Sequence, residues 1–355
     1  MATNGDRAAN SGDNTIDPEK FKRLFFTPVV PFLHDDPYTI DYDGYRSFIR
    51  GFMQDEYLEQ GIAIIANPEA GELFTLEREE RRKVLQICIE EAAGRCPVIA
   101  GVVHVHTKGY IETAKDAQEL GADGLFIFPP IGAGDIVAIW DSDKYPEIFS
   151  DIIKEVSAAV PLPVVIHPVG RYSIPFGQGL PIKTTKAILD ACPNIVAWKM
   201  TYNFDGYRKI ARFLQGYSRP VNILAAVGHY MHENHADRMF DGTSSGAWNY
   251  ALEPMMEHLK AWRKGDWKAA TDLWEGGGLA ELQQCIFEDI GRLHVRYKTA
   301  VWLRGLIKTP VMRPPMPKPR LTEIEEIAQA LVTANLQIIP ESEIKQVIQS
   351  LNLVL

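Results

Sequence analysis

The stretch Asn194-Ile195-Val196-Ala197-Trp198-Lys199-Met200 is an apolar run that carries an amine at its end. Such a run predicts a buried strand, and lysine is rarely buried without a reason. Burial disfavours the ammonium form and so lowers the pKa of the amine. A neutral lysine can attack an aldehyde or ketone and form a Schiff base. The alternative is a lysine whose stem packs on the strand while its charged end reaches water.

Outward from this run, short apolar segments alternate with helical ones. Most of these segments lack strict polar alternation, which is typical of parallel strands buried on both faces. Thr75 is the predicted cap of one intervening helix, whose first turn carries Glu77 and Glu79. The eight predicted strands are Phe25–Pro31, Gly61–Ala66, Pro97–Val103, Gly124–Phe128, Pro163–His167, Ile195–Met200, Val221–Val227 and Gly242–Ala247.

This order predicts an α/β fold, a (β/α)₈ TIM barrel followed by a C-terminal helical extension. An open doubly wound sheet is the alternative, but it usually has a glycine-rich phosphate turn after its first strand. Here the first strand leads into Thr27-Pro28-Val29-Val30-Pro31-Phe32.

After Ala251 the pattern is helical throughout. We expect a flexible N-terminal tail over residues 1–20, the barrel over 21–252 and a C-terminal helical region over 253–355, which could serve oligomer contacts. The expected C-terminal helices are Pro254–Lys264, Trp267–Asp289, Tyr297–Ile307, Leu321–Ala334 and Glu341–Leu351.

The bulk composition excludes several classes of protein. The chain has 355 residues, 46% of them hydrophobic, and a net charge of −9, which does not fit a nucleic-acid binder. No apolar run approaches the roughly 20 residues of a membrane span, and the polar N-terminus lacks the apolar segment of a secretory signal. The four cysteines are scattered and read as reduced thiols. We therefore expect a cytoplasmic protein with no nucleic-acid or membrane partner.

Eight short stretches follow the order and spacing of motifs from one enzyme family. They are Thr27-Pro28 with Pro31-Phe32, Ala70–Leu76 with Glu79-Glu80-Arg81, Val98–Val102, Gly121–Gly124, Pro129-Pro130, Gly170-Arg171, Ile195–Lys199 and Arg313-Pro314-Pro315. With these stretches the chain resembles the dihydrodipicolinate synthase and N-acetylneuraminate lyase family of class I, Schiff-base aldolases, as a divergent member.

The resemblance implies a barrel with a helical C-terminal part, commonly assembled as a homotetramer. It implies a Schiff base between Lys199 and the ketone of a 2-oxo acid, usually pyruvate, with no metal or organic cofactor. We therefore expect a lyase or aldolase that acts on a small carbonyl substrate by carbon–carbon cleavage or condensation, or by hydration or dehydration. A homo-oligomer, dimer or tetramer, is expected as well.

The loop after the second strand departs from the family pattern. The family usually has G-T-T-G-E, whose threonines help hold the pyruvate carboxylate, whereas this chain has Pro68-Glu69-Ala70-Gly71-Glu72. An ionised Glu69 would repel a 2-oxo carboxylate at low dielectric. Either Glu69 is protonated, or it points away as a surface acid, or the substrate is not an ordinary 2-oxo acid.

The fifth strand departs as well. The family usually has Y-N-x-P-G-R, whose tyrosine relays protons to the Schiff base. Here the run His167-Pro168-Val169-Gly170-Arg171 is one residue shorter and places His167 or Ile166 at the tyrosine position. Histidine can exchange protons near neutral pH, so His167 is the expected proton relay. Tyr172 is a possible substitute for it. Alternatively, His167 is a structural histidine that bonds a carbonyl in the core. Arg171 is a candidate carboxylate clamp or a rim salt bridge.

Further polar residues follow predicted strands, where the active sites of such barrels lie. We expect them to shape the pocket more than to do chemistry. They are Thr27, Asn67, His104, His106, Thr243, Ser244, Ser245 and His229.

A histidine-rich segment follows the seventh strand. His229, His232, Glu233 and His235 have the wrong spacing for H-E-x-x-H, so we expect a helix start at the pocket rim and no metal site.

Three hypotheses remain from the sequence. The first is the Schiff-base lyase just described. The second is an enzyme on the same barrel with a non-pyruvate substrate and Glu69 and His167 as its acid–base pair. The third is a non-catalytic binding barrel, which a buried and idle amine at Lys199 disfavours because it costs stability.

Overall fold

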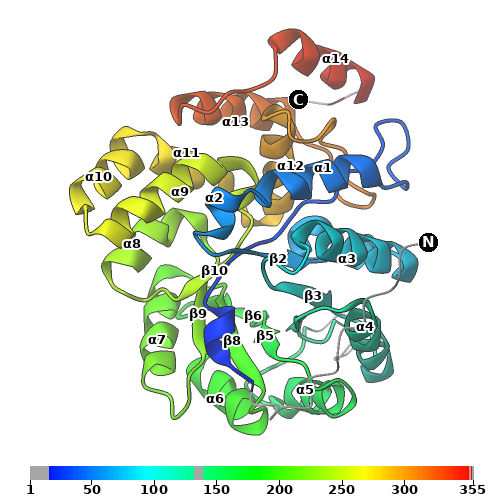
Figure 1. Cartoon of the computed structure of the whole chain (residues 1–355), viewed down its shortest axis with the longest axis vertical. Helices are drawn as coiled ribbons and strands as arrows, with labels where there is room; N and C mark the ends of the chain where they lie inside the picture. Colours follow the sequence, from blue (N-terminus) through cyan, green and yellow to red (C-terminus); the bar gives the residue numbers. More distant parts are fainter. Residues whose placement is uncertain (1–15, 132–138, 352, 354–355) are drawn as a thin grey trace.

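The computed structural model describes residues 16–131, 139–351 and 353. Within them, eight parallel strands close into a barrel in the order β1-β10-β9-β8-β5-β4-β3-β2 (Figure 1). The predicted TIM barrel is thereby confirmed. The barrel strands are β1 (Leu24–Phe26), β2 (Ile62–Ala66), β3 (Val98–Val102), β4 (Gly124–Ile127), β5 (Val164–Ile166), β8 (Ile195–Met200), β9 (Asn222–Ala225) and β10 (Gly242–Ser245).

The strands are short, and nearly every residue in them is buried, because helices cover the outside and side chains fill the inside. Strand β1 ends at Phe26, well before the predicted Pro31. Proline has no N–H to donate to a ladder, so Pro28 and Pro31 cannot continue the strand.

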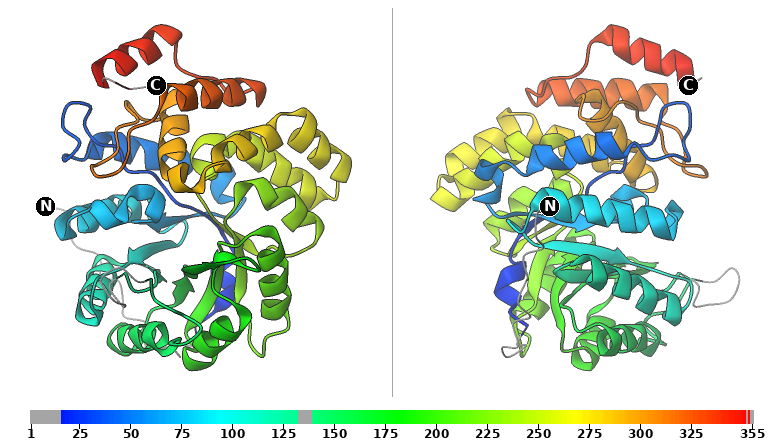
Figure 2. Two further views of the ribbon diagram at one scale, coloured as in Figure 1. Left: turned by 180° about the vertical axis from the view of Figure 1, so that it is seen from behind. Right: turned by 45° about the vertical axis from the view of Figure 1, so that its right-hand side comes forward.

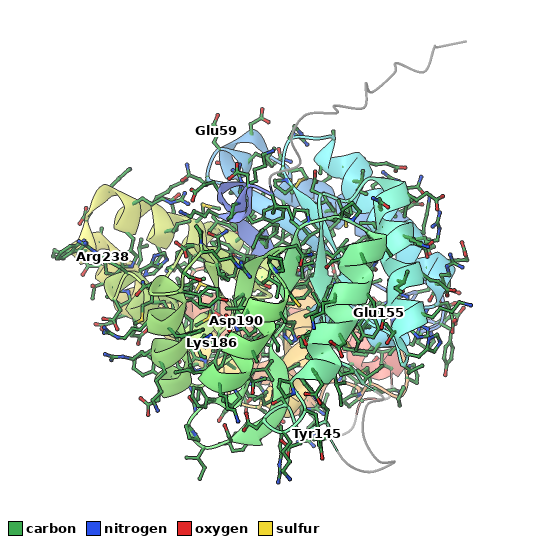
Figure 3. The ribbon with its side chains drawn as sticks, turned by 90° about the horizontal axis from the view of Figure 1, so that it is seen from below. Glu59, Tyr145, Glu155, Lys186, Asp190 and Arg238 are labelled. Carbon is green, nitrogen blue, oxygen red and sulfur yellow. The ribbon has the colours of Figure 1, made fainter. Side chains whose placement is uncertain are left out.

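Helices follow the strands around the barrel. They are α1 (Tyr42–Phe52), α2 (Asp55–Leu58), α3 (Arg78–Ala92), α4 (Thr107–Leu120), α5 (Glu147–Ala159), α6 (Ile182–Ala191), α7 (Phe204–Gln215), α8 (Met231–Ala236) and α9 (Trp248–Lys264). Short 3-10 turns are η1 (Pro18–Phe21), η2 (Glu69–Gly71), η3 (Leu73–Thr75) and η4 (Gly228–Tyr230). Seen from below, α5 and α6 show a polar outer surface on which Lys186 pairs with Asp190 (Figure 3).

The predicted cap of α3 at Thr75 is wrong. Thr75 lies in η3, where its hydroxyl donates to the carbonyl of Glu72. The cap is instead Glu77, two residues later, whose N–H donates to the Glu80 carboxylate at 2.8 Å, and the helix begins at Arg78.

A two-stranded hairpin that the sequence did not predict follows the fifth barrel strand. It consists of β6 (Val169–Ser173) and β7 (Gly177–Gly179), which pair antiparallel. The hairpin displaces the side chains that directly follow His167.

The two predicted domain boundaries, at residues 20/21 and 252/253, can be compared with the helices of the structure. Residues 1–15 of the expected tail lie outside the described residues, whereas η1 is ordered by its cap Asp17 and by buried Phe21. Helix α9 spans the expected boundary at 252/253 with a kink beside it at Ala251, where the backbone is not helical, so no linker separates the barrel from the C-terminal region.

The C-terminal region is helical, as expected, with a break inside the predicted Trp267–Asp289 helix where Gly278 adopts a φ of 72°. It comprises α10 (Trp267–Thr271), the π-turn η5 (Asp272–Gly276), α11 (Leu279–Phe287), η6 (Ile290–Arg292), α12 (Leu293–Leu303), α13 (Leu321–Thr333) and α14 (Glu341–Leu351). Helices α13 and α14 lie at the end of the molecule opposite α5 and α6 (Figures 1 and 2). In the described part of the chain, no helix combines the length and apolarity of a membrane span.

A buried ion pair joins the barrel to this region. Lys298 on α12 places its Nζ 2.6 Å from Oε1 of Glu72, and both side chains are almost fully buried. The second carboxylate oxygen of Glu72 accepts the N–H of Arg313 at 2.8 Å. The Arg313 guanidinium forms a bidentate pair with Glu80 at 2.6 and 2.7 Å. The loop after β2, helix α12 and the proline-rich segment are thus held by one cluster of charges.

Lys298→Met should lower the free energy of unfolding by about 3–5 kcal/mol, because it leaves the buried carboxylate of Glu72 without its counter-charge. Urea denaturation followed by circular dichroism measures this loss. Lys308→Met is the matched control, since Lys308 forms a pair of 2.9 Å with Asp41 but is 78% exposed and should cost no more than about 1 kcal/mol. Equal losses in the two variants would contradict a special role for the buried pair.

Candidate active site

A cavity of about 440 Å³ opens at the carboxyl ends of the barrel strands. Its wall contains Lys199, Glu69 and His167, which come from β8, from η2 after β2 and from the end of β5. Thr27, Ala70, His229 and Ser244 also line it, and Tyr172 lies at its mouth with 68% of its surface exposed. The structure therefore brings together most of the residues singled out from the sequence.

Lys199 lies on the sixth barrel strand, beside Leu224 of β9. Its side chain is only 12% exposed, and its Nζ lies 5.6 Å from the centre of the Phe126 ring. Burial lowers the pKa of the Lys199 amine, and the adjacent Glu69 partly offsets this effect. The apolar surroundings and the lowered pKa make this amine easier to deprotonate, and so more readily nucleophilic, than a free lysine.

Glu69 points into the cavity. Its Oε2 lies 3.4 Å from Nζ of Lys199 and 2.9 Å from Nε2 of His167. Burial acts to raise the pKa of the Glu69 carboxyl, but His167 and Lys199 outweigh it and hold that pKa below its ordinary value. The alternative of a surface acid that points away is thereby removed, since the Glu69 carboxylate faces Lys199 and His167 inside the cavity.

His167 is 1% exposed and packs against the rings of Phe126 and Phe128. Burial lowers the pKa of its imidazole to about 4, although Glu69 acts to raise it. A neutral imidazole whose Nε2 faces a carboxylate carries its hydrogen on that nitrogen and donates a hydrogen bond to the carboxylate. The Oγ1 of Thr201 lies 3.4 Å from the same nitrogen. The Glu69 carboxylate therefore links His167 to Lys199.

Six predicted site residues do not line the cavity, namely Arg171, Asn67, Ser245, Thr243, His104 and His106. Arg171 lies on the β6–β7 hairpin, where its side chain is 71% exposed and 3.8 Å from Asp141. The amide of Asn67 donates to the carbonyl of Arg81 on helix α3. The hydroxyl of Ser245 donates to the carbonyl of Ala226 and joins β10 to β9. The placement of Arg171 means that the expected carboxylate clamp is outside the pocket.

The remaining candidates have structural contacts. Thr243 donates to the carbonyl of Phe25 and accepts from the indole of Trp248. His106 caps α4 by accepting the N–H of Gly109 at 3.1 Å, and the ring of His104 packs against that of His106.

The C-terminal helices supply a wall of the cavity that the sequence did not predict. Phe287, His294 and Tyr297 line it from α11 and α12. Helix α12 was expected to start at Tyr297 but begins at Leu293, so His294 was missed. The close packing of α12 on the barrel explains the glycine at position 246, where a β-carbon would lie 2.2 Å from the Tyr297 ring. Only glycine permits that approach.

The sequence and the fold were compared with those of known proteins. Residues 20–335 match the model of the Dihydrodipicolinate synthetase family. The chain belongs to this family. A 4-hydroxy-tetrahydrodipicolinate synthase of Bradyrhizobium diazoefficiens is 26% identical over 325 residues, which cover 89% of this chain and 98% of that protein.

Solved structures share the fold. The YagE protein of Escherichia coli K12, crystallised in complex with pyruvate, has a TM-score of 0.72 at 21% identity, covering 89% of this chain and 99% of YagE. An N-acetylneuraminate lyase from Mycoplasma synoviae has a TM-score of 0.66 at 20% identity, covering 89% of this chain and 98% of the lyase. Homologues in the dihydrodipicolinate synthetase family are class I aldolase-type lyases, which confirms the predicted enzyme class.

In this family member, the histidine-rich segment after β9 divides between two environments. His229 lines the cavity, and burial lowers its pKa to about 4. His232 and His235 instead pack against α9, where Nδ1 of His232 lies 3.0 Å from Nε2 of His258. Glu233 is exposed. Among the described residues, no group of three or more His, Cys, Asp or Glu side chains is placed to hold a metal ion.

The packing of these histidines makes stability depend on pH. Burial lowers the pKa of His235 to about 4 and that of His258 to about 3. Unfolded histidines titrate near 6.5. Above that value both states are neutral and the full stability is present, whereas between about pH 6.5 and 4 only the unfolded state gains protons, so stability falls.

His258→Gln should reduce this acid-induced loss by about 1–2 kcal/mol between pH 6.5 and 4.5, since one histidine contributes at most about 1.4 kcal/mol per pH unit. Urea melts at a series of pH values measure it. His34→Gln, remote from the cluster, controls for the removal of any histidine. The account fails if both variants keep the slope of the parent protein.

Proposed function

We propose that this protein is a Schiff-base-forming lyase that acts on a small carbonyl substrate, with Lys199 as the nucleophile. The observation that carries the proposal is the nearly buried amine of Lys199 in a cavity at the carboxyl end of the barrel, 3.4 Å from a carboxylate. Membership of the dihydrodipicolinate synthetase family supports it, and so does the pyruvate in the crystal structure of YagE.

The chemistry follows from the position of the amine. Lys199 passes its proton to Glu69, and the neutral amine adds to the carbonyl carbon. The carbinolamine oxygen then takes protons and leaves as water, and an iminium ion remains. The iminium accepts the electron pair released when the neighbouring carbon loses a proton or a carbon fragment. Return of a proton and hydrolysis with water release the product and the free lysine.

Glu69 and His167 have different parts in this proposal. Glu69 is the group within reach of the reacting nitrogen, so it transfers the protons. His167 donates a hydrogen bond to the same oxygen at 2.9 Å and so orients Glu69. The sequence favoured His167 as the relay, with Tyr172 as a substitute, and also offered Glu69 and His167 as an acid–base pair. In this proposal Glu69 transfers the protons and His167 orients it.

Other parts of the expected function belong to the proposal as well. The lysine itself supplies the electron sink, so the proposed reaction needs no metal or organic cofactor. Assembly as a homo-oligomer is supported by the family resemblance. Cleavage, condensation and dehydration all proceed through the same iminium.

Lys199→Ala should abolish imine formation, with a loss on the order of 10³-fold or more, because no other described lysine lines the cavity. The protein is incubated with a panel of aldehydes, ketones and 2-oxo acids and cyanoborohydride, and adducts are mapped by mass spectrometry. Lys186→Ala, on the outer surface, should keep the adduct at Lys199. A parent protein without any adduct at Lys199 would disprove the Schiff base.

His167→Phe should lower the maximal rate of imine trapping by about 10–100-fold while changing the half-saturating carbonyl concentration less than about threefold. Glu69 loses its orienting donor, whereas the cavity keeps its shape. His167→Gln, which keeps an N–H donor near the same place, should recover part of the rate. Equal rates in the parent and His167→Phe proteins would assign the orienting role elsewhere.

A further inference from the structure

The charges in the cavity are balanced before any substrate enters. Among the described residues that line it, Lys199 and Glu69 are the ionisable groups of opposite charge, and no arginine is present. The histidines in the wall have pKa values lowered by burial, to about 4 for His229, and are uncharged at neutral pH. Arg171, which could have supplied a cation, lies outside on the hairpin.

This balance persists through the reaction. When an iminium forms on Lys199, its positive charge resides at the nitrogen that lies 3.4 Å from Glu69 Oε2. Glu69 is therefore the counter-ion of the intermediate. A substrate carboxylate bonded to the carbonyl carbon would place a second negative charge beside the same nitrogen. With a single cation and a desolvated site, two carboxylates in such proximity repel each other.

Most of the remaining wall is apolar or aromatic, although polar side chains that include Gln178, Thr201, Asn203 and Ser244 also line it. Tyr202, Phe287, Leu293 and Tyr297 contribute rings and an aliphatic chain. A volume of about 440 Å³ falls within the range of pockets that hold ligands much larger than a three-carbon acid. Such a wall stabilises an apolar substituent by burying it.

We propose that the substrate is an uncharged aldehyde or ketone that carries an apolar group about the size of an aromatic ring, and that Glu69 excludes 2-oxo acids. The inference rests on the proposed Schiff base at Lys199. Glu69 supplies from the protein the negative charge that a 2-oxo acid would bring with it.

Two carbonyl compounds that differ in one group test this proposal. 4-Phenyl-2-butanone and 2-oxo-4-phenylbutanoate share a ring and chain, and differ only in a methyl or a carboxylate on the carbonyl carbon. Each is incubated with the full-length protein and cyanoborohydride, which adds hydride to the imine carbon and leaves a stable secondary amine. The rate at which the Lys199 peptide gains mass is divided by the rate for n-butylamine, which removes the intrinsic difference in reactivity.

The normalised rate for the ketone should exceed that for the oxo acid at least tenfold. In Glu69→Gln the ratio should fall at least tenfold, since the repelling charge is gone while the side-chain size is kept. Any loss of proton transfer affects both compounds alike and cancels in the ratio. Circular dichroism melts verify that the variant is folded.

The other outcomes separate the two claims. Faster trapping of the oxo acid by the parent protein, or an unchanged ratio in Glu69→Gln, would overturn the substrate assignment and leave the Schiff base intact. The absence of any adduct at Lys199 with either compound, and with acetone and pyruvate, would overturn the proposed function and this inference with it.

Discussion

Two charges buried against each other, Glu72 and Lys298, hold the C-terminal helices to the loop that follows β2. A buried pair of this kind is tolerated only when each charge is matched, and Glu72 reaches that state by also accepting the N–H of Arg313. The loop on one side of the pair carries Glu69, and the helix on the other carries His294 and Tyr297. The cavity therefore has its shape because this contact sets the two walls relative to each other.

Lys199 and Glu69 illustrate how burial and charge act in opposite directions on one amine. Burial lowers the pKa of Lys199, and Glu69 partly restores it. A lowered pKa alone would leave the amine without a neighbouring group to accept the proton that its nitrogen must release during addition to a carbonyl. In the proposed mechanism, the carboxylate at 3.4 Å accepts that proton and balances the charge of the iminium. The proposal thus assigns to Glu69 an influence on the nucleophile, on proton transfer and on the charge of the substrate.

The motifs that supported the family resemblance do different physical work in the structure. Glu72, Glu80 and Arg313 form the charged cluster that joins barrel and C-terminal region. Lys199 lines the cavity. Arg171 follows the fifth strand as in the family, yet its hairpin carries it out to solvent. A matching residue type at a matching place in the sequence therefore did not ensure a place at the site, because the β6–β7 hairpin directs this side chain to solvent.

The sequence by itself predicted the barrel, because eight apolar runs alternate with helical segments and the first run lacks the glycine-rich turn of an open doubly wound sheet. It also singled out Lys199 as the candidate nucleophile, because an amine at the end of a buried strand is a local feature. Tertiary structure alone decided that Glu69 faces inward beside Lys199 and that α12 completes the wall with His294. Those contacts join residues more than a hundred positions apart, and their geometry depends on loop paths and helix starts that local sequence patterns do not specify.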